Sequence, residues 1–343
     1  MLKVIALIFI FLSACVFAQP SVVFLNPGKP TENFWAHVDL FALAAAQRLD
    51  LKLTIFHAKR EQYSMIKYLE KMIQQQQLPD YLMLVNEKQS LPRMLHLLEE
   101  QPVYVLILLN DLEAVLRSKY ALNTHWQQYI ISRLVPNNYW IGEQTAKAMY
   151  QQAGGQPGGV VLISGDRATP ASKEREAGAL SFFHQQTNLS VKPVIYGDWE
   201  QARSYQQSKS LLRRYPQLKY IWTANDHMAF GSLQAIQDIG KSAGKDIFLS
   251  SVNVSLEALK LREQGQLSAL GGGHFMAAGW GLRLIHLHYL GYALPSNVTL
   301  PMFRLVQPNT EFYQQLKAQD WSGIAFERLF LDEHNKLTLE FVH

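Results

Sequence analysis

Side chains suited to binding hydroxyl groups recur just after the predicted strands of this chain. They are mainly aromatic rings, amides and one guanidinium, at positions Glu32, Phe34, Trp35, Asn86, Asn110, Arg175, Trp199, Asn225, Asn253 and His274. Aromatic rings stack on the C–H faces of a polyol, while amides and arginine satisfy its hydroxyls as acceptors and donors. The pattern therefore indicates binding of a small, hydroxyl-rich molecule.

The motifs that commonly support catalysis or metal binding are missing from the sequence. There is no GxSxG or HExxH run, and the single cysteine, Cys15, lies in a leader-like N-terminus. His286 and His288 are two residues apart, so they do not share a helical face and are interpreted as surface histidines. Gly271–Gly273 lacks the Lys-Ser/Thr of a phosphate-binding loop and indicates a close backbone approach. We therefore expect no enzyme activity, no catalytic residue, no metal and no cofactor.

Short apolar runs alternate with helical patterns along the chain. The predicted strands are 21–27, 52–58, 80–86, 102–110, 158–165, 191–197, 219–225, 246–253 and 267–273. Residues 111–136 are less regular and separate the first four strands from the rest. Continuous apolar strands joined by helices are typical of parallel sheets. The predicted strand–helix units are too many for one doubly wound sheet of usual size. We therefore expect two doubly wound α/β lobes with a cleft at the carboxyl ends of their strands.

The first 18 residues have the layout of a secretory signal peptide. A short positive start is followed by the apolar run Val4–Leu12 and then by small residues. The run is too short for a membrane-spanning helix, which needs about 20 residues. Cleavage after Ala18 is one route; the other is a lipobox ending at Cys15, which would be acylated. We favour cleavage after Ala18, because the few residues between Cys15 and the first strand reach at most about 18 Å.

Composition excludes some classes of protein. The formal net charge is +4 without a dense Lys/Arg run, so no nucleic-acid partner is expected. A hydrophobic share of 48% with 17% charged residues is ordinary for a globular chain with a substantial core. The length remaining after the signal peptide is comfortable for two domains.

Residues 223–240 (TANDHMAFGSLQAIQDIG) carry a resemblance to a known family. They resemble the strand–Asn-Asp–Met-Ala segment of the type 1 periplasmic binding proteins, the ribose- and galactose-binding group. Supporting stretches are ENFW (32–35), LVN (84–86), VPNN (135–138), SKEREAG (172–178), GDW (197–199) and SVN (251–253). The resemblance covers nearly the whole chain after the signal peptide, except 111–134 and the tail after about 305.

The resemblance implies roles for individual residues. Those implied to contact ligand are Phe34, Trp35, Asn86, Arg175, Trp199 and Asn225, the aromatics by stacking and the others by hydrogen bonds. Asp226 is then expected to cap the helix that follows Asn225. Asn137-Asn138 resembles the first crossover between the lobes, and Gly271–Gly273 lies near the second. Each residue also has a structural reading, as a helix cap, a core side chain or a surface ion pair.

The chain departs from the family at the acidic positions of the site. Family members often have Asp after the fourth strand and at the turn that matches Asn253, whereas this chain has Asn110 and Asn253. Gly273 replaces a longer polar side chain, and the neighbouring His274 is expected to take over its role. Glu32 completes the set of candidate ligand-binding residues. The loss of two carboxylates indicates a different hydroxyl pattern, or a ligand whose anionic group pairs with Arg175.

Together these features predict an exported, periplasmic solute-binding protein, expected to be a monomer. Its lobes would be 19–137 with about 274–302, and 138–273 with about 303–343, joined by three hinge strands. It would close on a small carbohydrate-like ligand and deliver it to the membrane subunits of an ABC permease. The alternative is a sensory receptor that reports such a ligand to a membrane histidine kinase or chemoreceptor.

Overall fold

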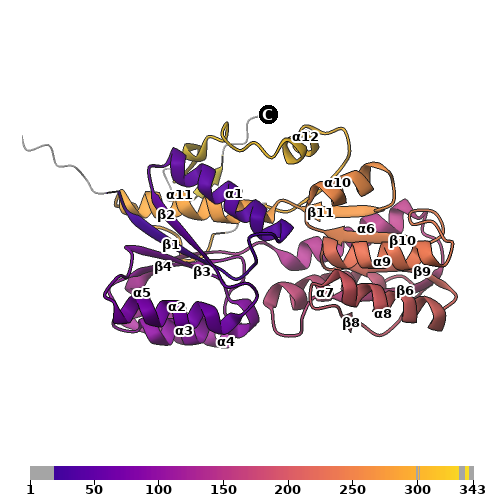
Figure 1. The fold of residues 1–343 in the computed structure, drawn as a ribbon, viewed down its shortest axis with the longest axis horizontal. Coiled ribbons are helices and arrows are strands. Elements are labelled where there is room, and N and C mark those ends of the chain that lie inside the picture. The colour runs from indigo at the N-terminus through magenta and orange to yellow at the C-terminus, as the bar shows by residue number, and fades with distance from the viewer. Residues whose placement is uncertain (1–18, 299, 301, 332–336, 340–343) are drawn as a thin grey trace, which may run out of the picture.

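The strands of the two halves of the chain form two separate parallel sheets. The computed structural model describes residues 19–298, 300, 302–331 and 337–339, so the expected signal peptide and Cys15 lie outside the described residues. Figure 1 shows each sheet with its helices as one of two lobes placed side by side. The predicted α/β class with two parallel-sheet lobes is therefore confirmed.

The first sheet has the strand order β2-β1-β3-β4-β5 and is parallel throughout. Its strands are β1 (Ser21–Asn26), β2 (Lys52–His57), β3 (Tyr81–Leu84), β4 (Tyr104–Leu108) and β5 (Ile130–Leu134). One face is covered by α1 (Asn33–Arg48) and α11 (Ala277–Tyr289), and the other by α2 (Gln62–Gln74) and α3 (Leu91–Leu98).

Burial on both faces explains the continuous apolar strands. Phe24 packs into the core shared with α1 and α11, whereas its neighbour Leu25 packs into the core shared with α2 and α3. In β3, Met83 likewise packs into the core shared with α1 and α11, and Leu84 packs into the core shared with α2 and α3. Because alternate residues point to opposite covered faces, nearly every strand position must be apolar.

Strand β5 lies in the region for which no strand was predicted. It follows α4 (Ala114–Ala121) and α5 (Thr124–Tyr129), and its short apolar run is interrupted by Ser132 and Arg133. Ser132 Oγ donates to the carbonyl of Pro295 (2.7 Å), and the backbone N–H of Arg133 donates to the carbonyl of Ser296 (3.1 Å). The strand thus depends on a segment 163 residues away, which local sequence cannot reveal.

The second sheet has the order β12-β11-β10-β9-β6-β7, with β8 paired to β6. Its strands are β6 (Gly158–Ser164), β7 (Leu189–Val191), β8 (Ile195–Tyr196), β9 (Leu218–Thr223), β10 (Phe248–Val252), β11 (Ala269–Gly272) and β12 (Arg304–Leu305). Only the β11–β12 pair in this sheet is antiparallel. The helices of this lobe are α6 (Asn138–Gln152), α7 (Pro170–His184), α8 (Gln201–Arg214), α9 (Asp226–Asp238) and α10 (Leu256–Glu263).

Two glycines let α6 and α7 pack with their backbones in contact. A Cβ at Gly142 of α6 would overlap the carbonyl oxygen of Arg175, and a Cβ at Gly178 of α7 would overlap that of Tyr139. The close approach fixes the height of α7 against α6 and so places the Arg175 side chain.

The chain passes between the lobes after β5, after β11 and before β12. The first passage leads into α6. The second leads through the short 3-10 helix η2 (His274–Met276) into α11, which lies on the first lobe although its sequence follows the second (Figure 1). In the described part of the chain these three passages link the two sheets, and the tail after β12 passes back to the first lobe a further time.

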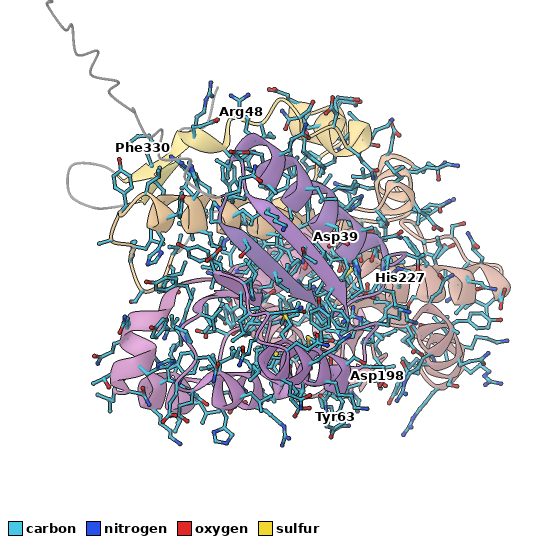
Figure 2. All side chains as sticks on the ribbon, turned by 60° about the vertical axis from the view of Figure 1, so that its left-hand side comes forward. Asp39, Arg48, Tyr63, Asp198, His227 and Phe330 are labelled. Atoms are coloured by element: carbon cyan, nitrogen blue, oxygen red, sulfur yellow. The ribbon has the colours of Figure 1, made fainter. Side chains whose placement is uncertain are left out.

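The C-terminal tail does not follow the expected division, which placed 303–343 in the second lobe. Helix α12 (Glu311–Ala318) does pack there, since Tyr313 Oη donates to Glu263 Oε2 (3.0 Å). Beyond it, however, Phe326 packs on Phe41 of α1, and Glu327 pairs with Arg48 at 2.8 Å. In Figure 2, Arg48 lies beside this yellow segment. Burial of its aromatic side chains draws the tail, with η3 (Phe326–Arg328) and the hairpin β13 (Leu329–Leu331) and β14 (Leu337–Leu339), back to the first lobe.

Candidate ligand-binding cleft

A small cavity lies between the lobes at the carboxyl ends of both sheets. The residues that line it come from both lobes: Phe34, Trp35, Arg60, Glu87, Leu109, Asn110, Pro136, Asn138, Thr169, Ala171, Arg175, Trp199, Asn225, Asn253 and His274. Its volume of about 50 Å³ admits a few water molecules but is too small for a monosaccharide. A larger molecule can enter only if the lobes part or side chains move.

Hydrogen bonds join the lobes directly across this cavity. The backbone N–H of Ala171, in the first turn of α7, donates to Asn110 Oδ1 of the first lobe (3.0 Å, buried). Gln89 Nε2 donates to the carbonyl of Ala168 (3.1 Å). The exposed Lys173 pairs with Glu113 at 3.2 Å. The structure is thus a closed arrangement of the two lobes.

Phe34 and Trp35 line the first-lobe wall at the start of α1, where they were predicted. Their rings meet edge to face at 5.0 Å, and Phe34 stacks on His274 at 4.4 Å between centroids. Gly28 permits this packing, because a Cβ there would overlap the Trp35 ring. Trp35 Nε1 is buried without a hydrogen-bond partner among the described residues, so this wall residue presents an aromatic surface and carries one unpaired donor.

Arg60, which the sequence did not single out, also lines the first-lobe wall. Its Nε donates to Glu32 Oε2 (3.0 Å), one terminal nitrogen donates to Glu87 Oε1 (2.7 Å), and the other pairs with Glu32. Its guanidinium carbon lies 5.8 Å from the centroid of the Trp35 ring. Burial lowers the pKa of Arg60, but Glu87 and Glu32 more than offset this and raise it above its ordinary value. Arg60 is therefore a fixed cation.

Two predicted residues do not line the cavity. Asn86 is fully buried in the first lobe, where Nδ2 donates to the carbonyl of Asp111 (2.8 Å) and Oδ1 accepts from the N–H of Leu91 (3.1 Å). Its amide holds the loop that leads into α3 and does not line the cavity. Glu32 lies behind Arg60 and positions it. The polar group that this loop brings to the cavity is the next residue, Glu87.

Arg175 is the buried cation of the second-lobe wall, as predicted. Its Nε donates to Asn138 Oδ1 (3.0 Å), and its terminal nitrogens donate to the carbonyl of Ala224 (2.9 Å) and to His274 Nε2 (2.9 Å). Burial lowers its pKa to about 10, and the nearby Glu174 and Asp226 oppose the shift. The group is therefore charged at neutral pH. All three of its hydrogen-bond acceptors are neutral, which leaves it able to bind ligand oxygens.

His274 lies against Arg175 and is held in one tautomer. Because a guanidinium can only donate, His274 Nε2 must accept, so the proton of the neutral ring is on Nδ1. Burial, followed by the charge of Arg175, lowers the pKa of His274 well below its ordinary value. Its Nδ1 is buried, and no residue that the structure describes is a hydrogen-bond partner for it. The ring thus offers a second free donor on a residue of the cavity wall.

Trp199 enters the second-lobe wall in the place predicted from the sequence. Its Nε1 donates to Asp166 Oδ2 (2.7 Å). Burial raises the pKa of Asp166, but hydrogen bonds from Thr169 and Trp199 hold it below its ordinary value. An ionised Asp166 thus fixes the orientation of the indole.

Asn225 lines the cavity, but its capping role differs from the expectation. Its Oδ1 accepts from the N–H of Met228 (2.9 Å), so Asn225 caps α9 and Asp226 is the first helical residue. The prediction that Asp226 is the cap was wrong, because the extended backbone of Asn225 places its side chain over the helix end. Its Nδ2 donates to the carbonyl of Trp199 (3.2 Å), which links these two parts of the wall.

Asn253 lines the cavity with a left-handed backbone (φ 87°). The following helix α10 is capped by Ser255, so the alternative reading of Asn253 as a cap does not hold. Its Nδ2 donates to Asp226 Oδ1 (3.0 Å), and its Oδ1 is buried without a partner. With Trp35 Nε1 and His274 Nδ1, it is one of three buried polar atoms of residues that line the cavity for which the described residues supply no partner. Buried polar atoms of this kind are expected to meet a ligand or water.

Two lobes that enclose an aromatic and polar cavity define a two-lobe solute-binding protein. No group of three or more His, Cys, Asp or Glu side chains that could hold a metal ion is found in the described part of the chain. The same residues include no helix long and apolar enough to cross a membrane.

Residues 22–282 match the family model described as "Periplasmic binding protein domain", and the chain belongs to this family. It is 32% identical to a periplasmic sugar-binding protein from Pseudomonas fluorescens, whose crystal structure superposes with a TM-score of 0.83 over 91% of this chain and 94% of that chain. Members of this family are binding proteins of transport systems and are not enzymes. The prediction that this chain has no enzyme activity is therefore confirmed.

Two further relatives match shorter parts of the chain. The D-allose-binding periplasmic protein of Escherichia coli (strain K12) is 29% identical over 39% of this chain and 42% of its own length. The ribose import binding protein of Bacillus subtilis (strain 168) is 26% identical over 42% of this chain and 45% of its own length. The chain thus matches less than half the length of these curated relatives.

Proposed function

We propose that this chain captures a sugar or a closely related polyhydroxylated molecule in the cleft and delivers it to the membrane subunits of an ABC permease. The observation that carries the proposal is the cavity wall, which has aromatic rings from both lobes and three residues with a buried polar atom that has no partner among the described residues. Rings and mixed donors and acceptors suit a polyol. Relatives described as sugar-binding and ribose import proteins support the same class of ligand and the role in import.

The proposed mechanism is closure of the lobes on the ligand. The cavity is too small to admit a sugar, so the lobes part about the segments that connect them to let it enter. A ligand that contacts both walls then favours the closed state by the difference in its affinity for the two states. We place the protein in the periplasm as a monomer, with its signal peptide cleaved after Ala18.

A ligand screen tests this function. Thermal unfolding followed by calorimetry should show that D-ribose, D-allose, D-galactose, sorbitol or D-gluconate binds with one site per chain. A ligand at 100 times its dissociation constant stabilises the folded chain by about 2.7 kcal/mol, which raises the unfolding midpoint by several degrees. A wider screen of sugars, polyols and sugar acids that gave no shift would contradict the function.

Replacing Asn110 with alanine should weaken ligand binding by about 5-fold. The change removes the buried hydrogen bond from Ala171 that joins the lobes only when they are closed, at a cost of about 1 kcal/mol. Lys173→Ala is the matched control, because its exposed ion pair with Glu113 should contribute almost nothing. Calorimetric titration compares the variants, and equal affinities for Asn110→Ala and wild type would contradict the closed arrangement.

A further inference from the structure

The cavity wall contains a carboxylate, although the two positions at which the resemblance predicts one hold Asn110 and Asn253. Glu87 lines the cavity and is only 1% exposed. It begins the short 3-10 helix η1 (Glu87–Gln89) and directly follows Asn86, the residue predicted to contact ligand. A carboxylate is an acceptor with two oxygens, the group best suited to receive hydrogen bonds from sugar hydroxyls.

We propose that Glu87 is the carboxylate that receives hydroxyl hydrogen bonds from the ligand and that Arg60 and Glu32 position it. This inference rests on the proposed sugar-binding function and names the first-lobe group that selects among sugars. Glu87 Oε1 accepts from Arg60 (2.7 Å), and the side-chain hydrogen bonds of the described residues include none to Glu87 Oε2. One oxygen therefore fixes the carboxylate and the other is open to a ligand.

The chain Glu32–Arg60–Glu87 is a preorganised unit. Glu32 binds the guanidinium through two nitrogens, and the third nitrogen of Arg60 donates to Glu87. Arg60 carries one positive charge against two carboxylates, so the unit has a net charge of −1 and leaves acceptor capacity on the wall. Glu87 lines the cavity from the first lobe and Arg175 from the second, so a ligand held there can meet an acceptor of one lobe and a donor of the other.

The backbone around this unit is strained on both sides. Lys59 (φ 53°) and Arg60 (φ 70°) are left-handed, as are Lys88 (φ 47°) and Gln89 (φ 61°). None of these is glycine, and such conformations are uncommon for other residues. Strain of this kind clusters at ligand clamps, where the surrounding structure enforces it. Gln89 also contacts Ala168 of the second lobe, so closure holds this loop in place.

Calorimetry with the tightest ligand of the panel above and its single-deoxy analogues tests the proposal. Glu87→Gln should reduce affinity for the parent sugar about 30-fold or more. One deoxy analogue, which lacks the hydroxyl that contacts Glu87, should bind wild type more weakly than the parent sugar does. The Glu87→Gln variant should bind this analogue and the parent sugar with equal affinity. Glu70→Gln is the control and should bind as wild type does, because Glu70 lies on α2 of the same lobe, outside the cavity, and its side chain, 37% exposed, pairs with Arg93 at 3.9 Å.

A pH titration separates a ligand-binding role from a structural one. Burial raises the pKa of Glu87, while Arg60 opposes the rise and Asp166 and Glu32 add to it. Affinity of wild type should therefore fall as the pH decreases through this raised value, and Glu87→Gln should not show that step. Arg175 stays charged and the depressed pKa of His274 keeps it neutral, so neither of these facing groups should contribute a step at neutral pH.

The outcomes distinguish this inference from the proposed function. If wild type binds a sugar but Glu87→Gln binds it equally tightly, the inference is wrong and the proposed function stands. The inference is also wrong if each deoxy analogue loses affinity, relative to the parent sugar, by the same factor in wild type and in Glu87→Gln. If no sugar binds wild type, the proposed function itself fails. Arg60→Lys keeps the charge but not the planar clamp, so a positioning role predicts an affinity between those of wild type and Glu87→Gln.

Discussion

Arg175→Ala should reduce sugar affinity by at least about 100-fold, the largest effect of any single change in the cleft. Removal of this guanidinium eliminates the charged donor of the second-lobe wall. It also leaves Asn138 Oδ1, the carbonyl of Ala224 and His274 Nε2 without their donor. Loss of a charged hydrogen bond together with buried unsatisfied groups corresponds to about 3 kcal/mol.

The control for Arg175→Ala is Arg203→Ala in the same lobe. Arg203 forms an exposed ion pair with Asp198 at 2.7 Å, so its loss should leave affinity unchanged. Calorimetry gives the affinities, and thermal unfolding shows whether each variant is folded at the temperature of the titration. An Arg175→Ala protein that is folded and binds within about 3-fold of wild type would show that the cavity is not the binding site.

Trp199→Ala should weaken binding about 30-fold, the second largest effect. The indole is the aromatic surface of the second-lobe wall, and truncation of a central aromatic contact costs about 2 kcal/mol or more. Trp199→Phe keeps a ring but loses the hydrogen bond to Asp166 that orients it, so its affinity should be intermediate. The exposed Trp140, also in the second lobe, supplies the control Trp140→Ala. Equal affinities for Trp199→Ala and Trp140→Ala would refute the stacking role.

The fold could be predicted because its strands are buried on both faces. That burial makes each strand a continuous apolar run, which is visible without any tertiary information. Strand β5 was missed because Ser132 and Arg133 interrupt its run and are satisfied by residues far along the chain. The return of the tail to the first lobe depends on the packing of Phe326 on Phe41, which no local pattern encodes.

Part of the candidate site could be predicted, because the strands are visible in the sequence and the residues that follow them can be identified. Residues directly after the strands converge on the cleft, and Phe34, Trp35, Arg175, Trp199, Asn225, Asn253 and His274 all line it. Asn86 does not, because the turn after β3 points the next residue, Glu87, into the cavity instead. Arg60 and Glu87 are 27 residues apart, so their pairing appears only when the sheet brings their loops together.

A crystal structure of the chain with the tightest ligand from the screen tests the central claim most directly. We predict a single ligand between the lobes, with its ring against Trp199 and the aromatic pair Phe34 and Trp35, and an oxygen within hydrogen-bonding distance of Arg175. A ligand bound elsewhere, for example in the groove beside Lys192 and Tyr215 at the far end of the second lobe, would contradict it.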